Sequence, residues 1–403
     1  MSITINQQPA SDWISAYNPI DYVFSSTNVA STSFKFIVDV YVNGVNVHRE
    51  LIPAHPIHQD GSINTNRIIS TFVEFDFDTN LNQSMVVTEP NSIKEVQLKI
   101  GEQFEVGGTL TDYVDLAETS LKIVNNSSIR TYELEGFDYT AWWNDLNANT
   151  KFLRRNKNIQ TLKQGQYAWL SALQAKNVTD LDNFVYKSYD ITGALIATHT
   201  LVNNFSNTSN SNEQRIRIPS GWNVNTIYPN FIDSTVAYYT IQGTNLGDGQ
   251  DTEIVRYNLD HCNKYGVYQI AYQNTLGGFD TFAFDLVART NLTKKTKSYE
   301  TAGVVRGVGS LSRPLNEHII RDYQTDGKTQ WRLTSDWIDA SEHEALSDLF
   351  DSPVVYLITP DNKLVACSSL SRPEWEEKID SIDRLFNLEL TFEGAFTNTR
   401  QTW

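Results

Sequence analysis

Histidines are the first residues in this sequence whose type and spacing could support chemistry. His48, His55 and His58 lie close together, and His55-Pro-Ile-His58 could present two imidazoles to a metal ion. No cysteine or carboxylate stands at a familiar ligand spacing from them, and the proline between two of them favours an extended turn. We therefore predict a loop or strand-edge role for this segment, and no metal site.

Nucleophilic and acid–base catalysis find equally little support. His261 precedes Cys262, but neighbouring residues on a strand point to opposite faces, so these two side chains would not meet. Asp280 and Asp285 belong to a set of 48 carboxylates in which pairs arise by chance, and we place both on the outer face of an amphipathic strand. The sequence has no serine-hydrolase, phosphate-loop or zinc-protease signature. We predict a protein that is not an enzyme, with no catalytic residue and no cofactor.

Aromatic residues are candidates for binding. The chain has 9 Trp, 19 Tyr and 19 Phe, and Trp142 and Trp143 are adjacent. On a strand, one of these two rings would face inward and the other outward. An exposed tryptophan stacks on sugars or anchors a protein interface. Core packing at a domain junction is the competing interpretation.

Basic residues are also candidates, because they interrupt an acidic chain. Residues 146–160 contain Arg154 and Arg155, and form either a solvated connector or a docking patch for an acidic neighbouring subunit. Residues 291–314 form a stretch with Gly and Ser that is either a solvated loop or a contact that becomes ordered on assembly. Its basic candidates are Lys294, Lys295, Lys297, Arg306 and Arg313. A turn at Gly277-Gly278, followed by Phe279, completes the predicted interface.

Charge and composition limit the partners of the chain. In 403 residues, 32 Lys and Arg stand against 48 Asp and Glu, for a net charge of −16. This charge repels phosphates, so we expect no sequence-specific nucleic acid binding, although an acidic wall would suit the lining of a DNA channel. Two cysteines fit folding in a reducing cytosol. We expect no secretory signal and no membrane anchor, because neither pattern is found.

The elements that position these residues are predicted to be mainly β-strands. Apolar and polar residues alternate through 34–42, and Asn43-Gly44 then predicts a type I′ hairpin turn, which requires positive φ at both central residues. Similar runs recur between turns along the first part of the chain. This pattern is typical of an antiparallel β-sandwich.

We divide the chain into three domains. Residues 1–148 form an N-terminal β-sandwich, 149–256 a second immunoglobulin- or fibronectin-like β-domain, and 257–403 a small α+β domain. In the last domain, Ser341 and Glu344 predict a capping box at the start of a helix, and residues 386–392 predict a half-buried strand. The predicted fold class is therefore mainly β, with antiparallel β-sandwich domains followed by a C-terminal α+β domain.

Three segments carry a resemblance to a known group of proteins. The first runs from Asn18-Pro19 through Asn43-Gly44 to Arg67-Ile68-Ile69, the second is YGVYQIAYQNTLGGFDTFAF, and the third begins at SDWIDASEHEALSDLFDSPVVYLI. Together they resemble virion structural proteins from phages and prophages of the Bacteroidetes, including crAss-like phages. The resemblance covers roughly the first 80 and last 150 residues, leaving the middle β-domain uncovered. It implies a tail, neck or baseplate component.

The expected function is therefore that of a non-enzymatic virion protein. We expect a homo-oligomeric ring in the tail or neck, bound to other tail or neck proteins, and assembled in the cytoplasm of the bacterial host. A carbohydrate- or receptor-binding module that uses Trp142, Trp143 or Trp222 is the alternative, and a glycan-cleaving enzyme is the third possibility.

Overall fold

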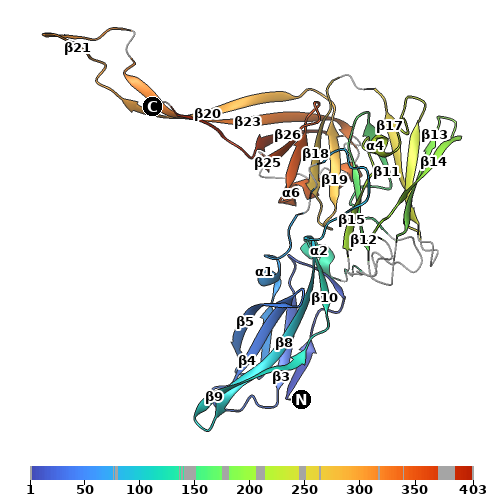
Figure 1. Ribbon diagram of the computed structural model, residues 1–403, viewed down its shortest axis with the longest axis vertical. Helices are drawn as coiled ribbons and strands as arrows, with labels where there is room; N and C mark the ends of the chain where they lie inside the picture. Colours follow the sequence, from blue (N-terminus) through green and yellow to red (C-terminus); the bar gives the residue numbers. More distant parts are fainter. Residues whose placement is uncertain are drawn as a thin grey trace. The chain divides into compact units, whose positions relative to one another are not determined.

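The computed structural model confirms a mainly β fold with antiparallel sheets and short helices (Figure 1). It describes residues 2–401 apart from 76, 78–79, 136, 138, 140–150, 175–180, 206–213, 245–250, 263–264, 316–317, 339 and 371–385. The chain groups into two compact units. Unit 1 contains Met1–His261 and Gln273–Thr281, and unit 2 contains Cys262–Tyr272 and Phe282–Trp403. Both predicted β-domains thus lie in unit 1, and the predicted boundary at 148/149 falls outside the described residues.

The first sandwich of unit 1 packs two sheets face to face. One sheet has the order β1 (Ile3–Gln7), β3 (Asp21–Ser26), β6 (Asp60–Asn64). The other has the order β2 (Trp13–Ser15), β10 (Lys122–Asn125), β8 (Ile93–Val106), β4 (Lys35–Val42), β5 (Val45–Pro53), with β9 (Thr109–Glu118) also paired to β8. Tyr22 and Phe24 from the first sheet meet Phe36, Val38 and Leu98 from the second in one apolar core. Burying these side chains stabilises the sandwich.

Two glycine-containing turns join the hairpins of this sandwich. Asn43 and Gly44 have φ values of 49° and 76°, so the predicted turn between β4 and β5 is confirmed. Gly107 and Gly108, at 61° and 85°, make the corresponding turn between β8 and β9. The short helices α1 (Asn66–Ile69) and α2 (Thr131–Leu134) lie in the connections.

The second sandwich of unit 1 borrows a strand from the N-terminal part of the chain. Its larger sheet has the order β11 (Ile159–Lys163), β17 (Val255–Asp260), β16 (Tyr238–Thr244), β13 (Asn183–Tyr189), β14 (Leu195–Val202). Its smaller sheet has the order β12 (Trp169–Gln174), β15 (Gln214–Pro219), β7 (Val87–Thr88). The core between them includes Tyr186 and Tyr239, and α4 (Val224–Ile227) packs Val224 against it. The two sandwiches are therefore joined by strand pairing.

Unit 2 is built on one large sheet with two short helices. The strand order is β19 (Phe279–Phe284), β18 (Tyr268–Gln273), β24 (Val355–Ile358), β25 (Leu364–Leu370), β26 (Phe386–Gly394), β23 (Ile320–Ile338), β20 (Arg289–Glu300), with β27 (Asn398–Gln401) also paired to β23. Helix α6 (Asp348–Asp351) contributes Leu349 to its core, and the turn that follows α5 (Ala340–Ala345) contributes Leu346. The predicted α+β character and the predicted strand over residues 386–392, which lies within β26, are confirmed. The predicted capping box is wrong, because α5 begins before Ser341, which lies inside the helix.

Candidate functional site

The turn at Gly277-Gly278 lies in the interior of unit 1. Phe279 is 1% exposed, and every residue from Ala271 to Asp280 is buried. Gly277 has a φ of +97°, and a Cβ on Gly278 would stand 2.0 Å from the carbonyl oxygen of Leu153, so glycine is required at both positions. The prediction that this turn is an exposed interface is therefore wrong for the single chain, because the turn makes internal contacts.

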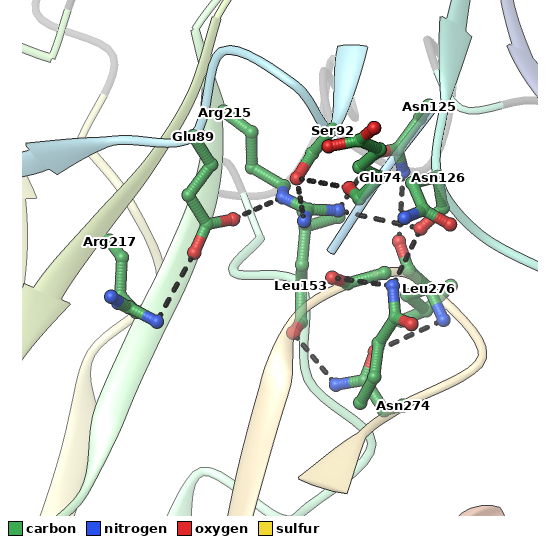
Figure 2. Close-up of polar contacts among 12 residues, drawn as sticks. Glu74, Glu89, Ser92, Asn125, Asn126, Leu153, Arg215, Arg217, Asn274 and Leu276 are labelled. Atoms are coloured by element: carbon green, nitrogen blue, oxygen red, sulfur yellow. Dashed lines mark hydrogen bonds and ion pairs between the residues drawn. The ribbon is translucent and has the colours of Figure 1, made fainter. Parts of the chain in front are cut away.

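The turn completes a buried polar cluster, shown in Figure 2, to which both sandwiches contribute. The Asn125 amide donates to the carbonyl of Leu276 over 3.0 Å, and the Gln273 amide donates to the carbonyl of Asn126 over 2.8 Å. The guanidinium of Arg215 donates to the Asn125 side-chain oxygen over 3.1 Å. These bonds satisfy polar groups that would otherwise be costly to bury.

Two arginines of β15 share a single carboxylate in this cluster. Arg215 donates through Nε to Glu89, and Arg217 lies 3.5 Å from the other oxygen of the same carboxylate. All three side chains are 0% exposed. The Arg217 guanidinium also lies 4.8 Å from the Phe77 ring centroid. Buried charge is tolerated here because it is paired and stacked on an aromatic ring.

Burial also changes the titration of the tyrosine in this cluster. The Tyr139 hydroxyl donates to Ser127 and accepts from the Asn125 amide over 3.3 Å. Its burial raises its pKa, while these hydrogen bonds and the nearby Arg215 oppose the rise. The hydroxyl therefore stays neutral, as a structural hydrogen-bonding group.

Arg154 and Arg155 are also engaged inside unit 1. Arg154 is buried and donates to the carbonyl of Lys157. Arg155 forms an ion pair with Glu133, and its backbone N–H donates to Asp280 over 3.3 Å. Both predictions for these arginines, a solvated connector and a docking patch, are therefore wrong, because the two side chains make contacts within unit 1. The sequence predicts Asp280 on an outer face. It is instead buried in unit 1, where it accepts the hydrogen bond from the backbone of Arg155.

Among the described residues of unit 1, no tryptophan is exposed enough to stack on a sugar. Trp142 and Trp143 lie outside the described residues, and Trp222 packs against the core of the second sandwich. A surface pocket of about 430 Å³ in unit 1 has no aromatic side chain among its described lining residues, which are Asn43, Thr88, Pro90, Asn91, Ile93, Lys94, Glu95 and Gln214. In unit 2, Trp337 is 63% exposed.

The basic candidates of unit 2 lie on a long hairpin, residues 289–332, which we name the arm. It is mostly exposed outside its base, where Trp331 on β23 belongs to the core of unit 2. The stretch predicted as a loop instead forms β20, paired with β23 from Arg289↔Arg332 to Glu300↔Ile320, and ends in the small hairpin β21 (Val305–Gly307)–β22 (Ser310–Ser312) (Figure 1). Every residue of β20 is exposed. Lys294, Lys295, Arg306 and Arg313 are all exposed on the arm, and Lys294 lies 3.6 Å from Asp322.

The arm also exposes large apolar side chains. Leu292 is 70% exposed and Ile320 66% exposed. Others are Tyr299, Val305, Val308, Leu311, Leu315, Ile319 and Tyr323. Large exposed apolar patches are found at protein–protein, membrane and ligand-binding sites.

Metal ligation and membrane spanning find no support in the part of the chain that the structure describes. No group of three or more His, Cys, Asp or Glu side chains gathers there, and the His55 and His58 rings stack with centroids 4.9 Å apart. No helix within the described ranges has the length and apolar character to cross a membrane. Comparison with protein-family models finds no match to this chain, and comparison with curated proteins finds none.

Proposed function

We propose that this chain is a non-enzymatic structural protein of a phage virion, a subunit of an oligomeric ring in the tail or neck. The observation that carries the proposal is the arm of unit 2. An isolated two-stranded hairpin is at best marginally stable in water, because it has no core of its own. Beyond the stretch in which β26 and β27 pair with β23, the arm is two-stranded, exposed and rich in apolar side chains, so burial against another protein would stabilise it.

The resemblance to phage virion proteins supports a ring rather than another kind of complex. Subunits of such rings use strand edges and extended loops to reach their neighbours. The polar cluster of unit 1 fits this role, since it links two sandwiches into one body. The partners are expected to be further copies of this chain and other tail or neck proteins.

Truncation of the arm tests the proposal. Replacing residues 298–323 by Asn-Gly would join the strands beside the Lys297↔Gln324 pair, and would leave the pairing of β27 with β23 intact. We expect the full chain to form oligomers by light scattering and rings by negative-stain imaging, while the truncated chain remains folded and monomeric.

A point variant controls for loss of apolar surface alone. Leu311→Ser/Leu315→Ser on the arm should weaken assembly, whereas Ile191→Ser, at an exposed turn of unit 1 where the side chain is 89% exposed, should not. A full-length chain that stays monomeric at every concentration, and is missing from purified phage particles, would contradict the proposed function.

A further inference from the structure

The arm is basic, although the chain as a whole is acidic. Residues 289–332 contain nine Lys and Arg against four Asp and Glu, in a chain of net charge −16. Arg306 and Arg313 stand at the exposed end of the arm. Two arms of this kind would repel each other, so a symmetric arm-to-arm contact is disfavoured.

The β8–β9 hairpin of unit 1 has the opposite character. Residues 103–118 contain four carboxylates and no Lys or Arg. Leu110 and Val114 are exposed, at 56% and 44%, and β9 pairs only with β8 among the described strands. The hairpin therefore offers negative charge, apolar side chains and a free strand edge on one element.

Local cations neutralise only the base of this hairpin. Lys99 lies 3.0 Å from Glu118, and this contact raises the pKa of the lysine. Arg49 lies in the field of Asp112 but is held by both oxygens of Asp39, at 2.6 and 2.7 Å. Nearer the tip, Glu105 and Asp112 are exposed, and the hairpin itself contains no Lys or Arg to balance their negative charge.

We propose that the arm of one copy docks on the β8–β9 hairpin of a second copy. Charge complementarity selects this partner, and the exposed apolar residues on both elements supply the area that is buried. A contact between two different surfaces is heterologous, so its repetition closes into a ring or continues as a filament. This inference rests on the proposed function and adds the pair of surfaces through which copies associate.

Charge exchange between the two surfaces tests the inference. Arg306→Glu/Arg313→Glu changes the charge of residues 301–315, at the end of the arm, from +2 to −2. Glu105→Lys/Asp112→Lys changes that of residues 103–113, at the tip of the hairpin, from −2 to +2. Each variant alone places like charges together in every contact, so we expect self-association at least about tenfold weaker than wild type at low salt. An equimolar mixture of the two should assemble again, because each reversed arm can then meet a reversed hairpin. Lys187→Glu/Lys363→Glu, at exposed positions on neither element, controls for net charge and should assemble normally.

The outcomes separate the two proposals. A wild-type chain that never assembles overturns the proposed function. A wild-type chain that assembles, with reversed variants that also assemble or a mixture that stays dissociated, overturns only the docking pair. An arm reversal that spares assembly but abolishes binding to duplex DNA would assign the arm to nucleic acid instead.

Discussion

Replacing Glu89 by alanine should strongly destabilise unit 1. The variant leaves Arg215 and Arg217 without their shared carboxylate, and both side chains are 0% exposed. Removing one partner of a buried ion pair costs about 3–5 kcal/mol, because the remaining charge has no compensation. Arg215 makes its described ion pair with this carboxylate at full burial, so we expect a loss of about 3–5 kcal/mol. Domains are typically stable by about 5–15 kcal/mol, so much of the native stability would be lost.

Urea unfolding followed by circular dichroism measures this loss, and hydrogen exchange locates it. Exchange should accelerate in β7 and β15, because Glu89 follows the first strand and the arginines lie on the second. Glu89→Gln keeps an acceptor for Arg215 and should cost less than the alanine variant. Glu389→Gln, whose partner Arg332 lies at the exposed surface of unit 2, should leave the free energy of unfolding close to wild type.

A small effect would refute the reasoning. If Glu89→Ala lowered the free energy of unfolding by less than about 1 kcal/mol, and exchange in both strands stayed at the wild-type rate, the buried arginines would not depend on this carboxylate.

Two further predictions follow from the packing of unit 1. Gly278→Ala should destabilise by about 3 kcal/mol or more, because the new Cβ would overlap the backbone oxygen of Leu153. Gly108→Ala, at φ +85° in open space, should cost only about 1–2 kcal/mol of backbone strain. Equal thermal unfolding midpoints for the two variants would contradict this ranking. Burial raises the pKa of Tyr186 and Tyr239 well above the usual value of about 10, so the unfolded chain loses these protons first and stability falls as the pH rises above about 10. Tyrosinate absorbance should therefore rise together with unfolding, and Tyr186→Phe/Tyr239→Phe should flatten the alkaline dependence; titration of both phenols near pH 10 in the folded protein would be inconsistent with their burial.

Local features of the fold follow from the sequence, because they depend on neighbouring residues. Asn43-Gly44 determines its own turn, and the alternation that ends at Phe392 identifies a strand with one buried face. The buried ion cluster could not be predicted in the same way. Arg215 and Arg217 alternate with isoleucines, a pattern typical of a solvent-facing strand, and their partner Glu89 lies 126 residues before Arg215.

The interface candidates are misplaced because local sequence patterns do not reveal what surrounds a segment in the folded chain. Gly277-Gly278 predicts a turn correctly, but turn chemistry does not specify whether protein or water surrounds it. The arm has the opposite difficulty. With every residue of β20 exposed, no alternation distinguishes the strand from a loop, and only its pairing with β23 reveals it.

The return of the chain at Gln273–Thr281 has a consequence for how this protein is made. Unit 1 remains incomplete on the ribosome until that short segment emerges, well after its last main strand at Val255–Asp260. A nascent chain that stops before it would leave the amide of Asn125 without the carbonyl of Leu276. A fragment that ends at His261, where the first part of unit 1 ends, would therefore lack residues 273–281 and the buried contacts that they make.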